Sequence, residues 1–209
     1  MVDKLGIYNA AMRFLSATRL SSLTEDRKDR RELDAVYDHA IDSMLEKGIW
    51  KFALRTVLMT PDTDIDSAFG PTHAYPKPDD FKRLRGFSSD EFFVHEIEDY
   101  REENGIWYTD HHEVYLSYVS NGNDYGRNLG LWPNLFVEAV GGFMAELTCI
   151  SINKDRGDRK DIINLSARAL RDAKVKEALD ERVKPKPPGR LVTSRLGIGR
   201  GMRARGIPG

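Results

Sequence analysis

Residues 5–58 read LGIYNAAMRFLSATRLSSLTEDRKDRRELDAVYDHAIDSMLEKGIWKFALRTVL. Their apolar residues recur every three or four positions, which is the spacing of amphipathic helices, at Leu5, Tyr8, Met12, Leu15, Leu33, Val36, Tyr37, Ala40, Ile41, Met44 and Leu45. The pattern predicts two helices joined by a loop, with Ser21, Ser22 or Thr24 as the N-cap of the second helix and Gly48 at its end. A hairpin this apolar on one face requires partners from elsewhere in the chain.

The composition is typical of a folded domain. The chain has 209 residues, of which 40% are hydrophobic and 31% are charged, and it is too apolar for a disordered protein. No apolar run approaches the roughly 20 residues of a membrane helix, and the N-terminus has no secretion signal, so we expect no membrane association. The lone Cys149 cannot form an internal disulfide, which favours a reducing compartment.

After the hairpin, the sequence changes from a helical to a β pattern. Four prolines and Gly70 between residues 60 and 80 argue against a continuous helix. Short β-rich runs follow at residues 92–97, 106–108 and 114–119. Asn104 and Gly105 form the clearest hairpin-turn motif between them. Residues 59–130 are therefore predicted to form a small antiparallel β-domain.

Two further helices are predicted after the β-section. One begins at Pro133, where a first helical turn tolerates proline, and the next begins near Asp158 and ends before Pro185. The fold predicted is mainly α: a four-helix bundle of residues 1–58 and 131–183, interrupted between helices 2 and 3 by the β-domain and followed by an extended C-terminal arm at residues 184–209. The expected bundle core is Leu15, Val36, Ile41, Leu45, Trp50, Phe136, Phe143 and Leu147.

The sequence offers few of the patterns that catalysis or metal binding requires. The acids at positions 62, 64 and 66 copy the opening of a calcium loop, but Ser67 stands where that loop needs glycine. His111 and His112 are adjacent, so on a strand their side chains point to opposite faces. Glu96 and Glu98 would suit an acid-rich hydrolase, although a solvated acidic face is the plainer interpretation. We therefore expect no enzyme, no metal and no cofactor.

The C-terminal segment differs in charge from the rest of the chain. Residues 184–209 carry seven Lys or Arg residues and no acid, and subtracting this +7 from the net charge of -1 leaves -8 for residues 1–183. The prolines and six glycines of the segment predict an extended arm. Its basic side chains could neutralise phosphates. Interleaved aliphatic residues favour docking on another protein instead, at Leu191, Val192, Leu196, Ile198, Met202 and Ile207.

Several segments also resemble a known family. The hairpin, with its Ser22-Leu23 loop and its ending at Trp50, Phe52 and Ala53, is similar to the start of the tail tubular protein A and head-to-tail adaptor (connector) family of tailed bacteriophages. The resemblance continues through YPKPDDFKRLRGF at residues 75–87, LWPNLFVEAVGGFMAELTCISINKD at 131–155 and LSARALRDAK at 165–174. Ser16, which stands where the family pattern has glycine, and Lys77, between two prolines, depart from it.

The resemblance implies a structural virion protein that is not an enzyme. It would form a homo-oligomeric ring, expected to be a dodecamer, at the head-tail junction after assembly in the host cytoplasm. The ring would bind the portal protein on one side and the next tail component, on the nozzle or tail tube side, on the other. The genome would pass through the lumen during ejection without specific DNA binding. The arm would dock on the portal through Arg190, Leu191, Arg195, Leu196, Ile198 and Arg200.

The basic arm also supports a second hypothesis, a nucleic-acid-binding accessory protein that uses the arm on DNA. A salt titration separates the two hypotheses. DNA affinity that depends on the arm would fall steeply with salt, with a slope set by about five to seven neutralised phosphates. An arm that docks on a protein would show no such DNA affinity.

Overall fold

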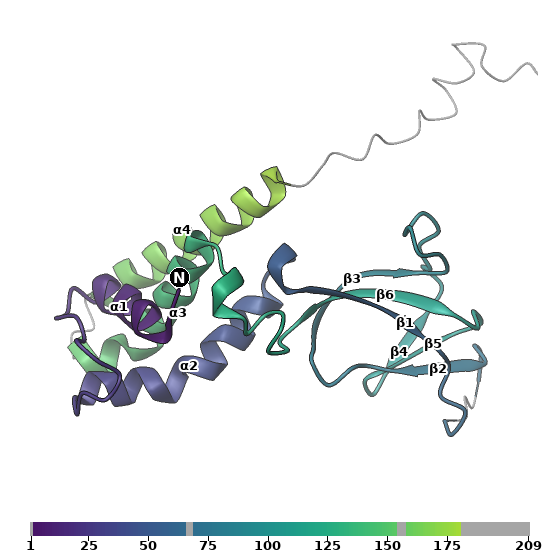
Figure 1. The fold of residues 1–209 in the computed structure, drawn as a ribbon, viewed down its shortest axis with the longest axis horizontal. Helices are drawn as coiled ribbons and strands as arrows, with labels where there is room; N and C mark the ends of the chain where they lie inside the picture. Colours follow the sequence, from purple (N-terminus) through teal and green to yellow (C-terminus); the bar gives the residue numbers. More distant parts are fainter. Residues whose placement is uncertain (1, 66–68, 154–157, 181–209) are drawn as a thin grey trace, which may run out of the picture. The chain divides into compact units, whose positions relative to one another are not determined.

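The computed structural model describes residues 2–65, 69–153 and 158–180. Figure 1 shows the elements in chain order. They are α1 (Lys4–Phe14), α2 (Lys28–Glu46), the 3-10 helix η1 (Lys51–Ala53), β1 (Leu54–Met59), β2 (His73–Pro76), β3 (Phe81–Ser88), β4 (Arg101–Glu103), β5 (Ile106–Thr109), β6 (Val114–Ser120), the 3-10 helix η2 (Leu129–Leu131), α3 (Asn134–Asn153) and α4 (Asp158–Leu179). The described residues thus form a mixed α and β structure with four α-helices and two small antiparallel sheets.

Trp50 lies at the centre of the helical core. Its indole N–H donates a hydrogen bond to the Met44 carbonyl at 2.8 Å, and its ring packs edge-on against Phe136 with centroids 4.8 Å apart. Gly48, predicted as the C-cap of α2, comes one residue after the C-cap, Lys47. A Cβ at this position would lie 2.6 Å from the Trp50 ring, so glycine is needed for close approach of the indole.

The predicted core residues have different degrees of burial. Leu15, Ile41, Leu45, Trp50 and Phe136 are buried, and Val36 and Phe143 are partly buried against the same core. Leu147 is 40% exposed, so its assignment to the core was wrong. The reason is that α3 is apolar around most of its circumference, and sequence spacing could not identify which apolar face is covered.

α3 packs through its smallest residues. A Cβ on Gly141 would lie 2.7 Å from the Cβ of Ala10 in α1, and a Cβ on Gly142 would lie 3.2 Å from the Cα of Ser166 in α4. Glycine at both positions therefore allows the neighbouring helices to approach closely. This packing turns the opposite side of α3, which includes Leu147, toward solvent.

The C-terminus of α1 is capped by a regular motif, whereas the N-terminus of α2 has no side-chain cap. Ser16 closes α1 with φ 51°, and the amides of Ser16 and Ala17 donate to the carbonyls of Arg13 and Met12, which is a Schellman motif. This conformation explains why glycine suits position 16.

The predicted N-caps of α2 were wrong, because α2 begins at Lys28 and its N-cap position, Arg27, has no side-chain cap. The serines and threonine form hydrogen bonds within the preceding loop instead; the Thr24 amide, for example, donates to Ser22 Oγ at 2.9 Å.

The strands form two sheets, in the orders β1-β6-β3 and β2-β5-β4, with every pairing antiparallel. Residues of both sheets contribute to one core, which contains Tyr75, Phe87, Ile97, Trp107, Val114, Leu116 and Tyr118. Asn104 and Gly105 join β4 to β5 with φ values of 48° and 76°. Two successive positive values are typical of a type I′ turn, so the predicted hairpin turn is confirmed.

The strands begin earlier in the sequence than predicted. Leu54 to Met59 pairs with β6 along its length, so the expected boundary at residue 58 falls inside a strand. β3 was missed because Lys82, Arg83 and Arg85 interrupt its apolar pattern. Residues 92–97, expected to form a strand, make only one isolated bridge, Ser88 to Glu96.

α3 is also long and apolar enough to cross a membrane when judged by length and composition alone. Within the described residues it is the one helix that meets this criterion, over Asn134–Ile152, which corrects the expectation that no such stretch exists. Half of the stretch is buried inside the protein. A buried core helix meets the same criterion, so the observation is weak evidence for a membrane span.

Candidate assembly surface

The outward side of α3 presents an apolar stripe, which we call the α3 face and define by Phe143, Leu147 and Ile150. These residues are spaced i, i+4 and i+7 and therefore lie on one side of the helix. Leu147 is 40% exposed, Ile150 is 47% exposed, and Phe143 is partly buried. Three large apolar side chains in a row are unusual on a surface that has no partner, and they mark a candidate site of protein contact.

Basic side chains from α2 border the α3 face. The Lys47 ammonium lies 3.9 Å from the centroid of the Phe143 ring, and the His39 ring lies 6.3 Å from the same centroid. Beyond Ile150, the Lys28 ammonium donates to the Ser151 carbonyl at 2.8 Å. The α3 face is therefore an apolar stripe with a cationic border, which suits a protein surface that carries acidic groups around an apolar patch.

A charged network joins α2 to the first sheet. The Asp42 carboxylate lies 3.0 Å from the Lys82 ammonium, 3.0 Å from the Arg127 guanidinium and 3.3 Å from the Asn121 amide nitrogen. Burial alone would raise the pKa of Asp42, but the bonds from Lys82 and Asn121 and the nearby positive charges hold it below its ordinary value. Arg127 also pairs with Asp38 one turn earlier on α2.

Asp80 is the second centre of this network. Its carboxylate accepts hydrogen bonds from the Tyr118 hydroxyl at 2.8 Å, from the Ser120 hydroxyl, and from Arg55 at 2.9 Å. Burial works to raise the pKa of Asp80, but these three donors outweigh it and lower the pKa. Asp80 lies in the 75–87 segment that carries part of the family resemblance. The Asp42 contacts join α2 to the first sheet, and the Asp80 contacts join β1 and β6 to the start of β3, all within one compact unit, Met1–Ala178.

Residues considered for metal binding or catalysis are dispersed. Across residues 2–65, 69–153 and 158–180, no group of three or more His, Cys, Asp or Glu side chains is placed to hold a metal ion. His111 and His112 are exposed, and the His112 ring packs edge-on against His73 at 5.4 Å. Cys149 is a buried free thiol in α3. Glu96 and Glu98 both line a cavity beside β3.

The predicted portal contacts are outside the described part of the chain, and so are Asp66 and Ser67 of the acidic loop. The predicted contacts are Arg190, Leu191, Arg195, Leu196, Ile198 and Arg200. Sequence reasoning missed the α3 face because it assigned two of its three residues, Phe143 and Leu147, to the core. The exposure of Leu147 and Ile150 follows from the glycine packing on the other side of α3, which spacing alone does not encode.

No protein-family model and no curated protein matches this chain. A functional proposal for it therefore depends on its residues and their arrangement.

Proposed function

We propose that this chain is a subunit of the head-to-tail adaptor of a tailed bacteriophage, a structural ring between the portal and the tail. The α3 face is the observation that carries the proposal, because it is an apolar surface that a neighbouring copy would cover. The family resemblance points the same way, since its segments include α3 and the 75–87 segment with Asp80. The proposal includes no catalytic role.

In this proposal the four helices act as a bundle interrupted by the β-domain, and residues 184–209 act as an arm. Each copy contributes the α3 face and meets a different surface of the next copy, which is a head-to-tail contact. Contacts of this type generate a closed ring when the rotation between copies closes, and we expect a dodecamer. The contacts around Asp42 fix the position of α2 relative to the first sheet, and an interface that repeats around a ring requires such a fixed position.

The charge distribution supports a role around DNA without tight DNA binding. Residues 1–183 carry a net charge of -8, as calculated from the sequence. A negatively charged ring wall repels the phosphate backbone and lets a genome slide through the lumen. The basic arm would bind the portal, and the β-domain would contact the next tail component. The site of action is then the head-tail junction of the virion.

Native mass measurements test this proposal. We expect the full-length chain to join a portal ring of the same phage in a fixed stoichiometry, and a chain truncated after Val183 to fail. If neither form binds the portal and the full-length chain shifts DNA at low salt, the adaptor proposal is wrong. The accessory DNA-binding hypothesis would then replace it.

A pair of variants tests the α3 face separately. Leu147→Glu combined with Ile150→Glu places two like charges in the proposed contact, and we expect it to abolish ring formation on the portal. The control is Leu58→Glu combined with Phe92→Glu, which alters two apolar residues that are 52% and 74% exposed in the β-part. Equal assembly of both double variants would show that the α3 face is not a ring contact.

A further inference from the structure

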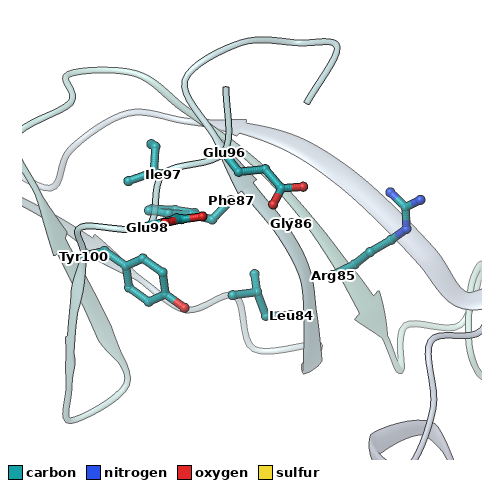
Figure 2. Close-up of a pocket in the computed structure, with 8 residues that line it drawn as sticks. All are labelled: Leu84, Arg85, Gly86, Phe87, Glu96, Ile97, Glu98 and Tyr100. Carbon is teal, nitrogen blue, oxygen red and sulfur yellow. The ribbon is translucent and has the colours of Figure 1, made fainter. Parts of the chain in front are cut away.

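A cavity of about 330 Å³ opens beside β3. β3 is an outer strand of its sheet. On the side of β3 away from β6, the segment that follows β3 forms the Ser88 to Glu96 bridge, and its Ile97 amide donates to the Phe87 carbonyl at 2.8 Å. That segment then continues to β4 in the other sheet, and the cavity occupies the space where it leaves β3. Figure 2 shows its lining residues, Leu84, Arg85, Gly86, Phe87, Glu96, Ile97, Glu98 and Tyr100.

The lining combines an apolar floor with an acidic border. Phe87 and Ile97 are buried in the β core, and the Tyr100 ring packs edge-on against Phe87 at 5.3 Å. Glu96 and Glu98 are exposed and stand across the cavity from Leu84 in Figure 2. Counting Arg85, the lining carries a net charge of -1. This combination suits a side chain with an apolar stem and a cationic head.

The loop that leads to Glu96 is held firmly in one conformation. The Asp90 carboxylate accepts hydrogen bonds from the backbone amides of Phe92 at 2.9 Å and His95 at 2.6 Å. The bond from the His95 amide is the main cause of a lowered pKa for Asp90, about 2. Phe93 adopts φ 55° and packs over Gly86, where a Cβ would lie 3.0 Å from its ring. An aromatic residue keeps such a conformation only when its surroundings impose it.

We propose that this cavity binds an extended peptide segment of a partner protein that carries an arginine between aliphatic residues. The segment adds to the outer edge of β3 by main-chain hydrogen bonds, and the cavity selects its side chain. The guanidinium pairs with Glu96 and Glu98, while the aliphatic stem packs on Leu84 and Tyr100. Arginine fits better than lysine because its planar head can bind carboxylates in pairs and stack on the Tyr100 ring.

Other ligands fit this cavity less well. A nucleic acid would place phosphates beside Glu96 and Glu98, and like charges repel. A divalent cation generally takes six or more oxygen ligands, whereas the described lining offers the carboxylates of Glu96 and Glu98 on exposed side chains. An extended basic peptide uses the edge strand, the apolar floor and the acidic border together.

The test uses the full-length chain and the peptide acetyl-Gly-Thr-Val-Arg-Val-Thr-Gly-amide. Its twin carries citrulline, which has the shape of arginine without the charge. We expect the arginine peptide to slow hydrogen exchange of backbone amides in residues 82–86 and to bind at least tenfold more tightly than the citrulline twin in a calorimetric titration. A tenfold ratio corresponds to about 1.4 kcal/mol, which a single hydrogen bond to a charged group can contribute.

Matched variants separate the cavity from general electrostatics. Glu96→Gln combined with Glu98→Gln should weaken binding of the arginine peptide at least tenfold. Glu91→Gln combined with Asp124→Asn removes the same charge from exposed positions that do not line the cavity, and should leave the affinity unchanged. Equal losses in both double variants, or no change in exchange of residues 82–86, would overturn the proposal.

This inference does not depend on the proposed ring. The variant with Leu147→Glu and Ile150→Glu should bind the arginine peptide normally, because the α3 face is separate from the cavity lining. A chain that assembles on the portal but does not bind the arginine peptide would refute only the inference. A chain that binds the peptide but never joins a portal would refute only the proposed function.

Discussion

Replacing Asp80 with alanine should be among the most damaging single changes in the first sheet. The Asp80 carboxylate is the shared acceptor for Tyr118, Ser120 and Arg55. Tyr118 and Ser120 are fully buried, so their hydroxyls cannot turn to water when the acceptor is lost. The Arg55 side chain is 39% exposed and can be rehydrated.

The expected cost follows from these exposures. Each buried donor left without an acceptor costs about 1–3 kcal/mol, and a partly exposed ion pair contributes about 1 kcal/mol or less. With two buried donors and one ion pair, we therefore expect Asp80→Ala to lower the free energy of unfolding by about 2–7 kcal/mol. The free energy of unfolding of globular proteins is only about 5–15 kcal/mol, so the loss should be easily measured.

Urea denaturation monitored by circular dichroism and tryptophan fluorescence measures this cost. Asp79→Ala is the matched control, because Asp79 is the exposed neighbour of Asp80 and its removal should change stability by less than about 0.5 kcal/mol. Arg55→Ala should cost no more than about 1 kcal/mol. If Asp80→Ala were no more destabilising than Arg55→Ala, the argument from buried hydroxyls would be refuted.

The stability lost in Asp80→Ala should depend on pH, and the loss should be smaller in acid. The pKa of Asp80 is lowered in the folded state, despite burial, by the Ser120, Tyr118 and Arg55 donors. A group of this kind contributes stability above its unfolded pKa, near 3.9, and loses the contribution as the pH falls through the folded value. The stability difference between the unaltered chain and Asp80→Ala should therefore be constant at neutral pH and shrink below about pH 4.

Three further changes test other parts of the structure. Ser16→Gly should raise the free energy of unfolding by about 0.5–1 kcal/mol in a thermal melt, because φ 51° suits glycine better; a lower melting temperature would contradict this. Gly141→Ala should lower it by about 1–3 kcal/mol, since the new Cβ meets Ala10 at 2.7 Å, and an unchanged stability would show that α1 can shift. Asp90→Asn should speed hydrogen exchange of the Phe92 and His95 amides, and unaltered rates would show that Asp90 does not hold the loop.

Local patterns in the sequence were sufficient for the elements with strong periodicity. The spacing of apolar residues predicted the four helices, and Asn104-Gly105 predicted the β4–β5 turn, because two positive φ values are required there. β3 was not predicted, since its basic residues at 82, 83 and 85 break the apolar pattern. Tertiary contacts explain these basic residues, because Lys82 pairs with Asp42 and Arg83 donates to the Glu46 carbonyl.

The sequence by itself determined which segments are helical, where one hairpin turns and how charge divides between residues 1–183 and 184–209. These properties follow from neighbours in the chain, through helical period, turn conformation and composition. The tertiary structure alone decided which apolar residues are covered. Leu147 and Ile150 have the same periodicity as the buried residues of α3, but the close approach of α1 and α4 at Gly141 and Gly142 turns them outward. The cavity beside β3 and the Asp80 network likewise depend on residues that are distant in sequence.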